Sequence, residues 1–167
     1  MSAPVQTAVQ IAWVTTDLAA TETALKNLLG VRKWVRIPEV HFGPDTNTYR
    51  GRPADFVASI SLSYLQDMQL ELIEPVRGTA NIYTDFLRER GAGLHHICVE
   101  AADADAFDAA VDNATAHGAE VAAAGVMPGG MRFAYVSDHQ HGVPYLEIAL
   151  IPDEIKAFFD HIKQEQS

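Results

Sequence analysis

Two hydrophobic periods alternate along the 167-residue chain, one typical of strands and one typical of helices. A β-branched apolar segment at residues 9–14 predicts a strand, and Asp17 stands where the N-cap of a following helix belongs. Leucines then recur at helical spacing up to Gly30, which predicts the end of that helix. The same order returns later, with a strand at residues 94–100 and a helix at 103–117. Each half of the chain is therefore expected to begin with a strand and a helix.

Three further strands are predicted after each of these helices. In the first half they cover residues 31–40 (broken at Pro38), 59–64 and 68–73, with a loop at 43–55. Serines at 59, 61 and 63 alternate with apolar residues and predict a strand with one face in solvent. In the second half the strands cover residues 119–126, 131–137 and 145–151. A short helix is expected at residues 82–90, and a terminal helix is expected to begin at Pro152.

The two halves align as an internal repeat. A shift of 86 residues places Gln10 on His96 and Asp17 on Asp103, and each half ends with a similar Leu-Glu strand. A duplicated βαβββ unit explains this pattern, and a chance match of two amphipathic helices is the alternative. We expect an α+β fold in a single domain over residues 1–167. Its two modules cover about 8–75 and 94–151, and a C-terminal helix covers 152–166.

Composition and charge narrow the classes of function. Apolar residues make up 48% and charged residues 20%, as in globular proteins. The net charge of −10 argues against nucleic acid as a partner, and no apolar run reaches the roughly 20 residues that span a bilayer. The N-terminal stretch has no pattern of a secretory signal, and Cys98 is the single cysteine, so we expect a cytoplasmic protein.

Four polar residues interrupt the apolar strands at equivalent places in the two halves: Gln10, Glu71, His96 and Glu147. Strand alternation directs each of them away from the face that packs under a helix. Two buried carboxylates need compensation, which one divalent metal ion would supply. The alternative interpretation is that each side chain lies on a solvent-facing surface of its strand.

The chain resembles the vicinal oxygen chelate superfamily, which includes glyoxalase I, methylmalonyl-CoA epimerase, extradiol dioxygenases and bleomycin-resistance proteins. The resemblance covers residues 8 to 151, and its clearest segments are Val9–Leu29, Leu70–Pro75, Leu94–Cys98 and Tyr145–Ile148. It implies two tandem βαβββ modules that form a cupped mixed sheet, the glyoxalase-like fold. It also implies a metal ion held in the cup by Gln10, Glu71, His96 and Glu147. The repeat selects His96 rather than His95.

Within the superfamily the resemblance is mixed. The Leu-Glu-Leu-Ile-Glu-Pro and Leu-His-His-Ile-Cys segments look most like methylmalonyl-CoA epimerase, which has His in place of Gln10 and Gln in place of Glu71. The complete ligand set is instead similar to that of glyoxalase I. Zn, Ni, Co, Mn and Mg all suit one nitrogen and three oxygen ligands.

The resemblance implies a metal-dependent isomerase, epimerase or lyase that removes a proton next to a carbonyl. We expect Glu147 as the first choice of base and Glu71 as its counterpart. Arg132, Arg50 and Arg52 are candidates for binding a small-molecule substrate such as an anionic thioester. The alternative is a protein that sequesters an apolar compound in the same cup, lined by aromatic side chains. The apolar terminal helix could cover a homodimer interface or its own domain.

Overall fold

The computed structural model describes residues 6–167, so part of the N-terminal stretch assessed for a secretory signal lies outside the described residues. Ten strands and four α-helices follow one another in an α+β order. Their bounds are β1 Ala8–Val14, α1 Leu18–Leu29, β2 Val35–Phe42, β3 Asn47–Tyr49, β4 Arg52–Pro53, β5 Phe56–Leu65, β6 Met68–Gly78, α2 Ile82–Arg90, β7 Gly93–Glu100, α3 Ala104–Ala116, β8 Glu120–Val126, β9 Arg132–Asp138, β10 Val143–Leu150 and α4 Asp153–Gln164. A short 3₁₀ turn, His139–His141, precedes β10.

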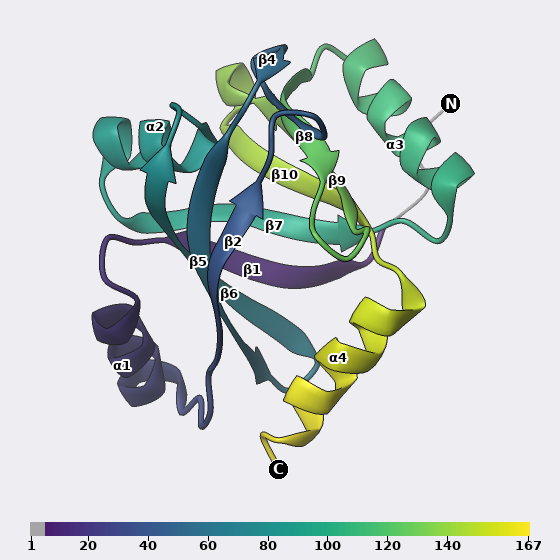
Figure 1. The fold of residues 1–167 in the computed structure, drawn as a ribbon. Coiled ribbons are helices and arrows are strands. Elements are labelled where there is room, and N and C mark those ends of the chain that lie inside the picture. Colours follow the sequence, from purple (N-terminus) through teal and green to yellow (C-terminus); the bar gives the residue numbers. More distant parts are fainter. Residues whose placement is uncertain (1–5) are drawn as a thin grey trace.

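All ten strands form one curved mixed sheet in the order β2-β5-β6-β1-β7-β10-β9-β8-β3-β4. The first strands of the two repeats, β1 and β7, lie side by side at its centre and run antiparallel (Figure 1). Ile11 pairs with Ile97, its own counterpart in the repeat. On either side, β6 pairs parallel with β1 and β10 pairs parallel with β7. The sheet therefore has an approximate twofold axis through its two central strands, which confirms the cupped mixed sheet.

The helices divide between the two faces of the sheet. On the outer face, α1 packs Leu18 and Leu25 against Leu72 of β6, and α3 packs Phe107 against β8, β9 and β10. On the inner face, the largest core cluster contains Phe86 from α2 and Ile162 from α4. Figure 1 shows α1 and α3 at opposite ends of the molecule, with α4 beside the ends of β5 and β6.

Local signals in the sequence explain where several helices begin and end. Asp17 accepts a hydrogen bond from the Ala20 amide, and Asp103 accepts one from the Ala106 amide. Gly30 ends α1 with a positive φ of 73°, which a residue without a side chain adopts easily. These boundaries confirm the sequence predictions. At α4 the prediction is off by one residue, because Pro152 is the N-cap rather than the first helical residue.

Three expectations in the first half are wrong. Pro38 does not break a strand, because β2 is an edge strand with a bulge between Ile37 and Val40 and needs no amide donor there. Residues 43–55 are not only a loop, since they contain β3 and β4, and β3 pairs with β8 of the second half. Ser61 and Ser63 are fully buried rather than wet. Ser61 donates a hydrogen bond to Glu22 of α1, so α1 covers this face.

Candidate metal centre

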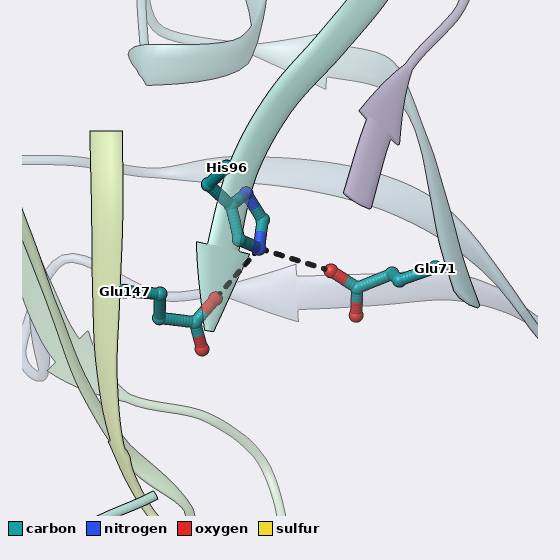
Figure 2. Close-up of side chains that lie close together, drawn as sticks. All are labelled: Glu71, His96 and Glu147. Carbon is teal, nitrogen blue, oxygen red and sulfur yellow. Dashed lines mark ion pairs between the residues drawn. The ribbon is translucent and has the colours of Figure 1, made fainter. Parts of the chain in front are cut away.

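Four polar side chains converge on the inner face of the sheet, one from each of its four central strands. His96 Nε2 on β7 lies 2.9 Å from Glu147 Oε2 on β10. The same nitrogen lies 3.1 Å from Gln10 Oε1 on β1 and 3.7 Å from Glu71 Oε1 on β6. Figure 2 shows the two carboxylates reaching the imidazole from different strands. The structure thus brings together all four side chains that the sequence singled out.

The amide of Gln10 has a fixed orientation. Its Nε2 donates a 2.6 Å hydrogen bond to Gln69 Oε1, and Gln69 Nε2 in turn donates to the Tyr64 hydroxyl at 3.1 Å. The carbonyl oxygen of Gln10 therefore faces His96. Sequence reasoning missed Gln69, although its position two residues before Glu71 places it on the same strand face, directly opposite Gln10.

Two small residues form the floor of the cluster. Ala12 lies opposite both Glu71 and His96 in the strand register, and it is fully buried. Cys98 is its counterpart in the repeat and lies opposite Glu147. Burial raises the pKa of the Cys98 thiol well above its usual value, and the nearby Glu147 and Glu71 act in the same direction. Cys98 is thus a neutral small side chain, and both positions leave room for the converging ligands.

A β-bulge places both histidines of the pair on the inner side. Ala12 pairs with His96 while Trp13 pairs with Leu94, so His95 is the extra residue in β7. The His95 ring is buried and stacks on Tyr145, with the ring centroids 4.8 Å apart. Burial lowers the pKa of His95 well below its usual value, and the neighbouring His96 lowers it further. His95 therefore remains neutral, and its Nδ1 lies 2.8 Å from Nδ1 of His96.

Burial, together with two carboxylates, raises the pKa values of the acidic groups in and around the cluster. Burial raises the pKa of Glu71 well above its usual value, and the nearby carboxylate of Glu147 raises it further, opposed by a hydrogen bond from Gln10. Tyr83 and Tyr135, whose hydroxyls lie 2.7 Å apart, have raised pKa values, first through burial and next through Glu147. A cation between the carboxylates would relieve this accumulation of negative charge.

The donor set fits a divalent metal ion. Glu71, His96 and Glu147 offer ligand atoms that all lie within 4.8 Å of one another, and Gln10 adds a carbonyl oxygen directed to the same place. With Nε2 of His96 deprotonated, one nitrogen and three oxygens face a common centre. Such a set suits borderline or hard divalent cations and leaves positions for other oxygen ligands. The cluster can therefore hold one metal ion.

Two cavities with different chemistry adjoin the cluster. A cavity of about 140 Å³ is lined by Gln10 and Glu71 and otherwise by apolar side chains of the sheet, of α4 and of the segment before β9. A second cavity of about 310 Å³ is lined by Gln10, Gln69 and Cys98, together with charged residues that include Lys156 and Lys163 of α4. Glu71 lines the smaller cavity, whereas Glu147 lines neither. Of the two carboxylates in the cluster, Glu71 is therefore the one that faces a cavity.

The three arginines expected to bind substrate lie outside this cluster. Arg132 pairs with Asp108 of α3 at 2.9 Å and lies over the Phe107 ring, so it belongs to the outer face. Arg50 and Arg52 lie in the β3–β4 hairpin, with the Arg50 guanidinium over the Tyr49 ring. None of the three lines either of the cavities beside the cluster.

The aromatic side chains expected to line the cup lie in different parts of the molecule. Phe42, Phe56 and Phe133 pack with Tyr83 in the inner core. Tyr64 lines the larger cavity, whereas Trp34 packs on the outer face beside α1. Much of the cup is thus filled by the protein's own aromatic core, and the two cavities that adjoin the cluster lie on the α4 side.

A curved sheet of two βαβββ repeats, with four ligand-type side chains on its axis, defines the glyoxalase-like class of proteins. Residues 9–135 match the Glyoxalase/Bleomycin resistance protein/Dioxygenase superfamily, and the chain belongs to this family. No curated protein matches the sequence.

Solved structures of low sequence identity share the fold. Methylmalonyl-CoA epimerase from Mycobacterium tuberculosis is 15% identical, with a TM-score of 0.60 over 90% of this chain and 91% of that one. A hypothetical protein from Bacillus halodurans is 16% identical, with a TM-score of 0.61 over 90% and 97% of the two chains. A Streptomyces coelicolor methylmalonyl-CoA epimerase in complex with 2-nitronate-propionyl-CoA is 21% identical, with a TM-score of 0.56 over 90% and 97%.

No helix within residues 6–167 combines the length and apolar character needed to cross a membrane.

Proposed function

We propose that this protein is a metal-dependent enzyme that moves a proton on the carbon next to a carbonyl, as an epimerase or isomerase does. One observation carries the proposal. Two carboxylates from opposite halves of the sheet, Glu71 and Glu147, lie within 3.7 Å and 2.9 Å of the same imidazole nitrogen. A metal ion held by these groups, His96 and Gln10 would act as a Lewis acid that stabilises the negative charge of an enolate.

The protein's own groups supply the remaining steps. Glu71 faces the apolar cavity, so its carboxylate lies where it could accept a proton from a group bound there and return it. We therefore assign to Glu71 the proton transfer on the cavity side, although the sequence analysis ranks Glu147 first as the base. Glu147 is its counterpart across the axis. Two bases on opposite faces of a planar enolate give epimerisation, whereas one base that moves the proton between carbons gives isomerisation.

The substrate class is proposed by analogy with the structural neighbours. The solved structures that share the fold include a methylmalonyl-CoA epimerase complex with methylmalonyl-CoA and others with 2-nitronate-propionyl-CoA. A thioester is a suitable substrate here because its carbonyl acidifies the adjacent C–H bond. The candidate ligands, however, include Gln10 and Glu71, at the positions where methylmalonyl-CoA epimerase has His and Gln.

The test combines metal content with hydrogen exchange. The chain is purified without chelator or metal column, loaded with Co, Zn, Ni or Mn, and incubated in D₂O with 2-methylacyl thioesters and with hemithioacetals. We expect about one ion per chain and deuterium incorporation at the carbon next to the carbonyl. Glu71→Gln and Glu147→Gln should each abolish epimerisation, and one of the two should retain exchange on a single face. Absence of metal binding after loading would overturn the proposal.

A second candidate function is sequestration of an apolar compound without catalysis. The apolar cavity beside Glu71 favours this function, because it has room for a small ligand whether or not a metal ion is bound. Two measurements distinguish these functions. A sequestering protein would bind its ligand equally well after Glu71→Gln and His96→Ala, and it would catalyse no exchange in D₂O.

A further inference from the structure

The apolar cavity beside Glu71 has a wall formed by the sheet. Ile37 and Val40 of the edge strand β2 line it, together with Ile60 and Leu62 of β5. These residues belong to, or pack against, the inner core cluster, so their positions are fixed by surrounding side chains. A pre-formed apolar wall of this kind favours an apolar group in contact with it.

The opposite wall comes from α4 and from the segment between β8 and β9. Ile155, Phe158 and Phe159 project from successive turns of α4, and Met127 and Met131 complete the enclosure. Methionine side chains adapt their shape to the group that they contact. The volume of about 140 Å³ is close to that of an engineered cavity of about 150 Å³ that binds benzene.

The cavity has no counter-charge for an anion. Among the described residues that line it, none is basic, and its polar groups are the amide of Gln10 and the carboxylate of Glu71. The two lysines near the cluster line the other cavity, where Lys156 pairs with Glu100 at 2.9 Å and Lys163 pairs with Asp67 at 2.5 Å. A carboxylate in the apolar cavity would therefore be desolvated next to Glu71 without compensation.

We infer that the substrate carries an uncharged apolar substituent, larger than methyl and up to the size of a phenyl ring, which occupies this cavity next to Glu71. The inference rests on the proposed function for the position of the reacting carbon. The polar remainder of the substrate would pass Gln10, which lines both cavities, and extend into the larger, charged cavity. Residues of α4 thereby determine which substituents the site accepts.

The first arm of the test uses the metal-free chain and toluene as the probe, detected by ligand-observed NMR. We expect toluene to bind the native chain and not Val40→Lys, which places an ammonium group in the cavity. Val121→Lys is the matched control, because Val121 is an exposed valine outside both cavities. Thermal melts of the two variants confirm that each is folded. Failure of the native chain to bind toluene, or equal binding by both variants, would overturn the inference.

The second arm uses the Co-loaded chain and three hydroxamates, which all chelate metals in the same way. The visible spectrum reports chelation. We expect benzohydroxamate to bind at least about tenfold more tightly than acetohydroxamate, and the hydroxamate of succinic acid to bind about tenfold more weakly. Val40→Lys should reverse the preference between the aromatic and the carboxylate-bearing probe, and Val121→Lys should not.

The outcomes separate the two proposals. If the three hydroxamates bind the metal with equal affinity, the inference about the substituent is wrong and the metal-dependent function stands. If the chain binds no metal, the proposed function is wrong, and toluene binding to the metal-free chain alone decides whether the cavity takes an apolar group.

Discussion

His95 and His96 are adjacent in the sequence, and their rings meet through the two Nδ1 atoms, 2.8 Å apart. A hydrogen bond between two imidazole nitrogens needs one donor and one acceptor. When Nε2 of His96 is directed to a metal ion, its Nδ1 carries the proton and donates it to His95. The neutral state of His95, maintained by burial, supplies the acceptor. His95 thus orients a candidate ligand without facing the ion itself.

This relationship predicts the effect of changing His95. His95→Leu keeps an apolar volume but removes the acceptor, so metal affinity should fall by about 10- to 100-fold. His95→Asn keeps an acceptor oxygen near the position of Nδ1 and should lose far less affinity. Competition titration against a coloured chelator measures both. Equal affinities in the two variants would show that His95 acts only through packing.

Glu71→Gln should affect stability and metal binding in opposite directions. The substitution removes one of two buried carboxylates, so the free energy of unfolding of the metal-free chain should rise by about 1 kcal/mol. Metal affinity should fall because an anionic ligand is lost. Urea unfolding with and without metal tests both parts. Glu120→Gln, at an exposed position, is the control and should change neither quantity.

The contact between α1 and β2 should contribute a pH-dependent part of stability. Arg36 donates two hydrogen bonds to Glu22, at 2.8 and 2.9 Å, and Ser61 donates a third at 2.7 Å. Arg36 holds the pKa of Glu22 below its usual value of 4.5. A carboxylate with a lowered pKa in the folded state stabilises the protein above the unfolded pKa, and this contribution is lost as the pH falls below it.

Glu22→Gln should therefore reduce the free energy of unfolding by about 1 kcal/mol at pH 7, a value limited by the exposure of Arg36. The difference from the native chain should shrink as the pH falls below 4.5. Urea unfolding at a series of pH values measures it. Glu165→Gln is the control, because its pair with Lys33 is exposed and should contribute nothing measurable.

The C-terminal helix should behave as part of the protein's own core. Ile162 is fully buried in the inner cluster, so Ile162→Ala should lower the free energy of unfolding by about 2–4 kcal/mol. Phe158→Ala, at a position 37% exposed, should cost much less. If α4 instead covered a homodimer interface, the loss in Ile162→Ala would depend on protein concentration in the unfolding experiment.

The sequence was sufficient to predict the four converging side chains because each one interrupts an apolar strand at a position fixed by the repeat. Its failures have local physical causes. Pro38 looks like a strand breaker unless β2 is known to be an edge strand, which is a property of the whole sheet. Ser61 looks solvated until α1 brings Glu22 over it.

Pairings between distant segments carried no local signal. The β3–β8 ladder joins residues about 76 positions apart, and β3 has only three residues. The same limit applies to Arg132, whose place on the outer face depends on the register of β9 and on its pairing with Asp108 of α3. Gln69 was missed because its contact with Gln10 depends on the register between β1 and β6, which the local pattern does not reveal.

The pairing of Ile11 with Ile97 has a consequence for the ancestry of the site. Two copies of a single half, related by a true twofold axis at this pair, could build the same central sheet. Two copies of the first half would present two amides and two carboxylates, whereas two copies of the second would present two imidazoles and two carboxylates. In the single chain, these equivalent positions hold two different residues, Gln10 and His96. That difference, together with the apolar cavity that Glu71 lines and Glu147 does not, makes these two equivalent carboxylates chemically unequal partners.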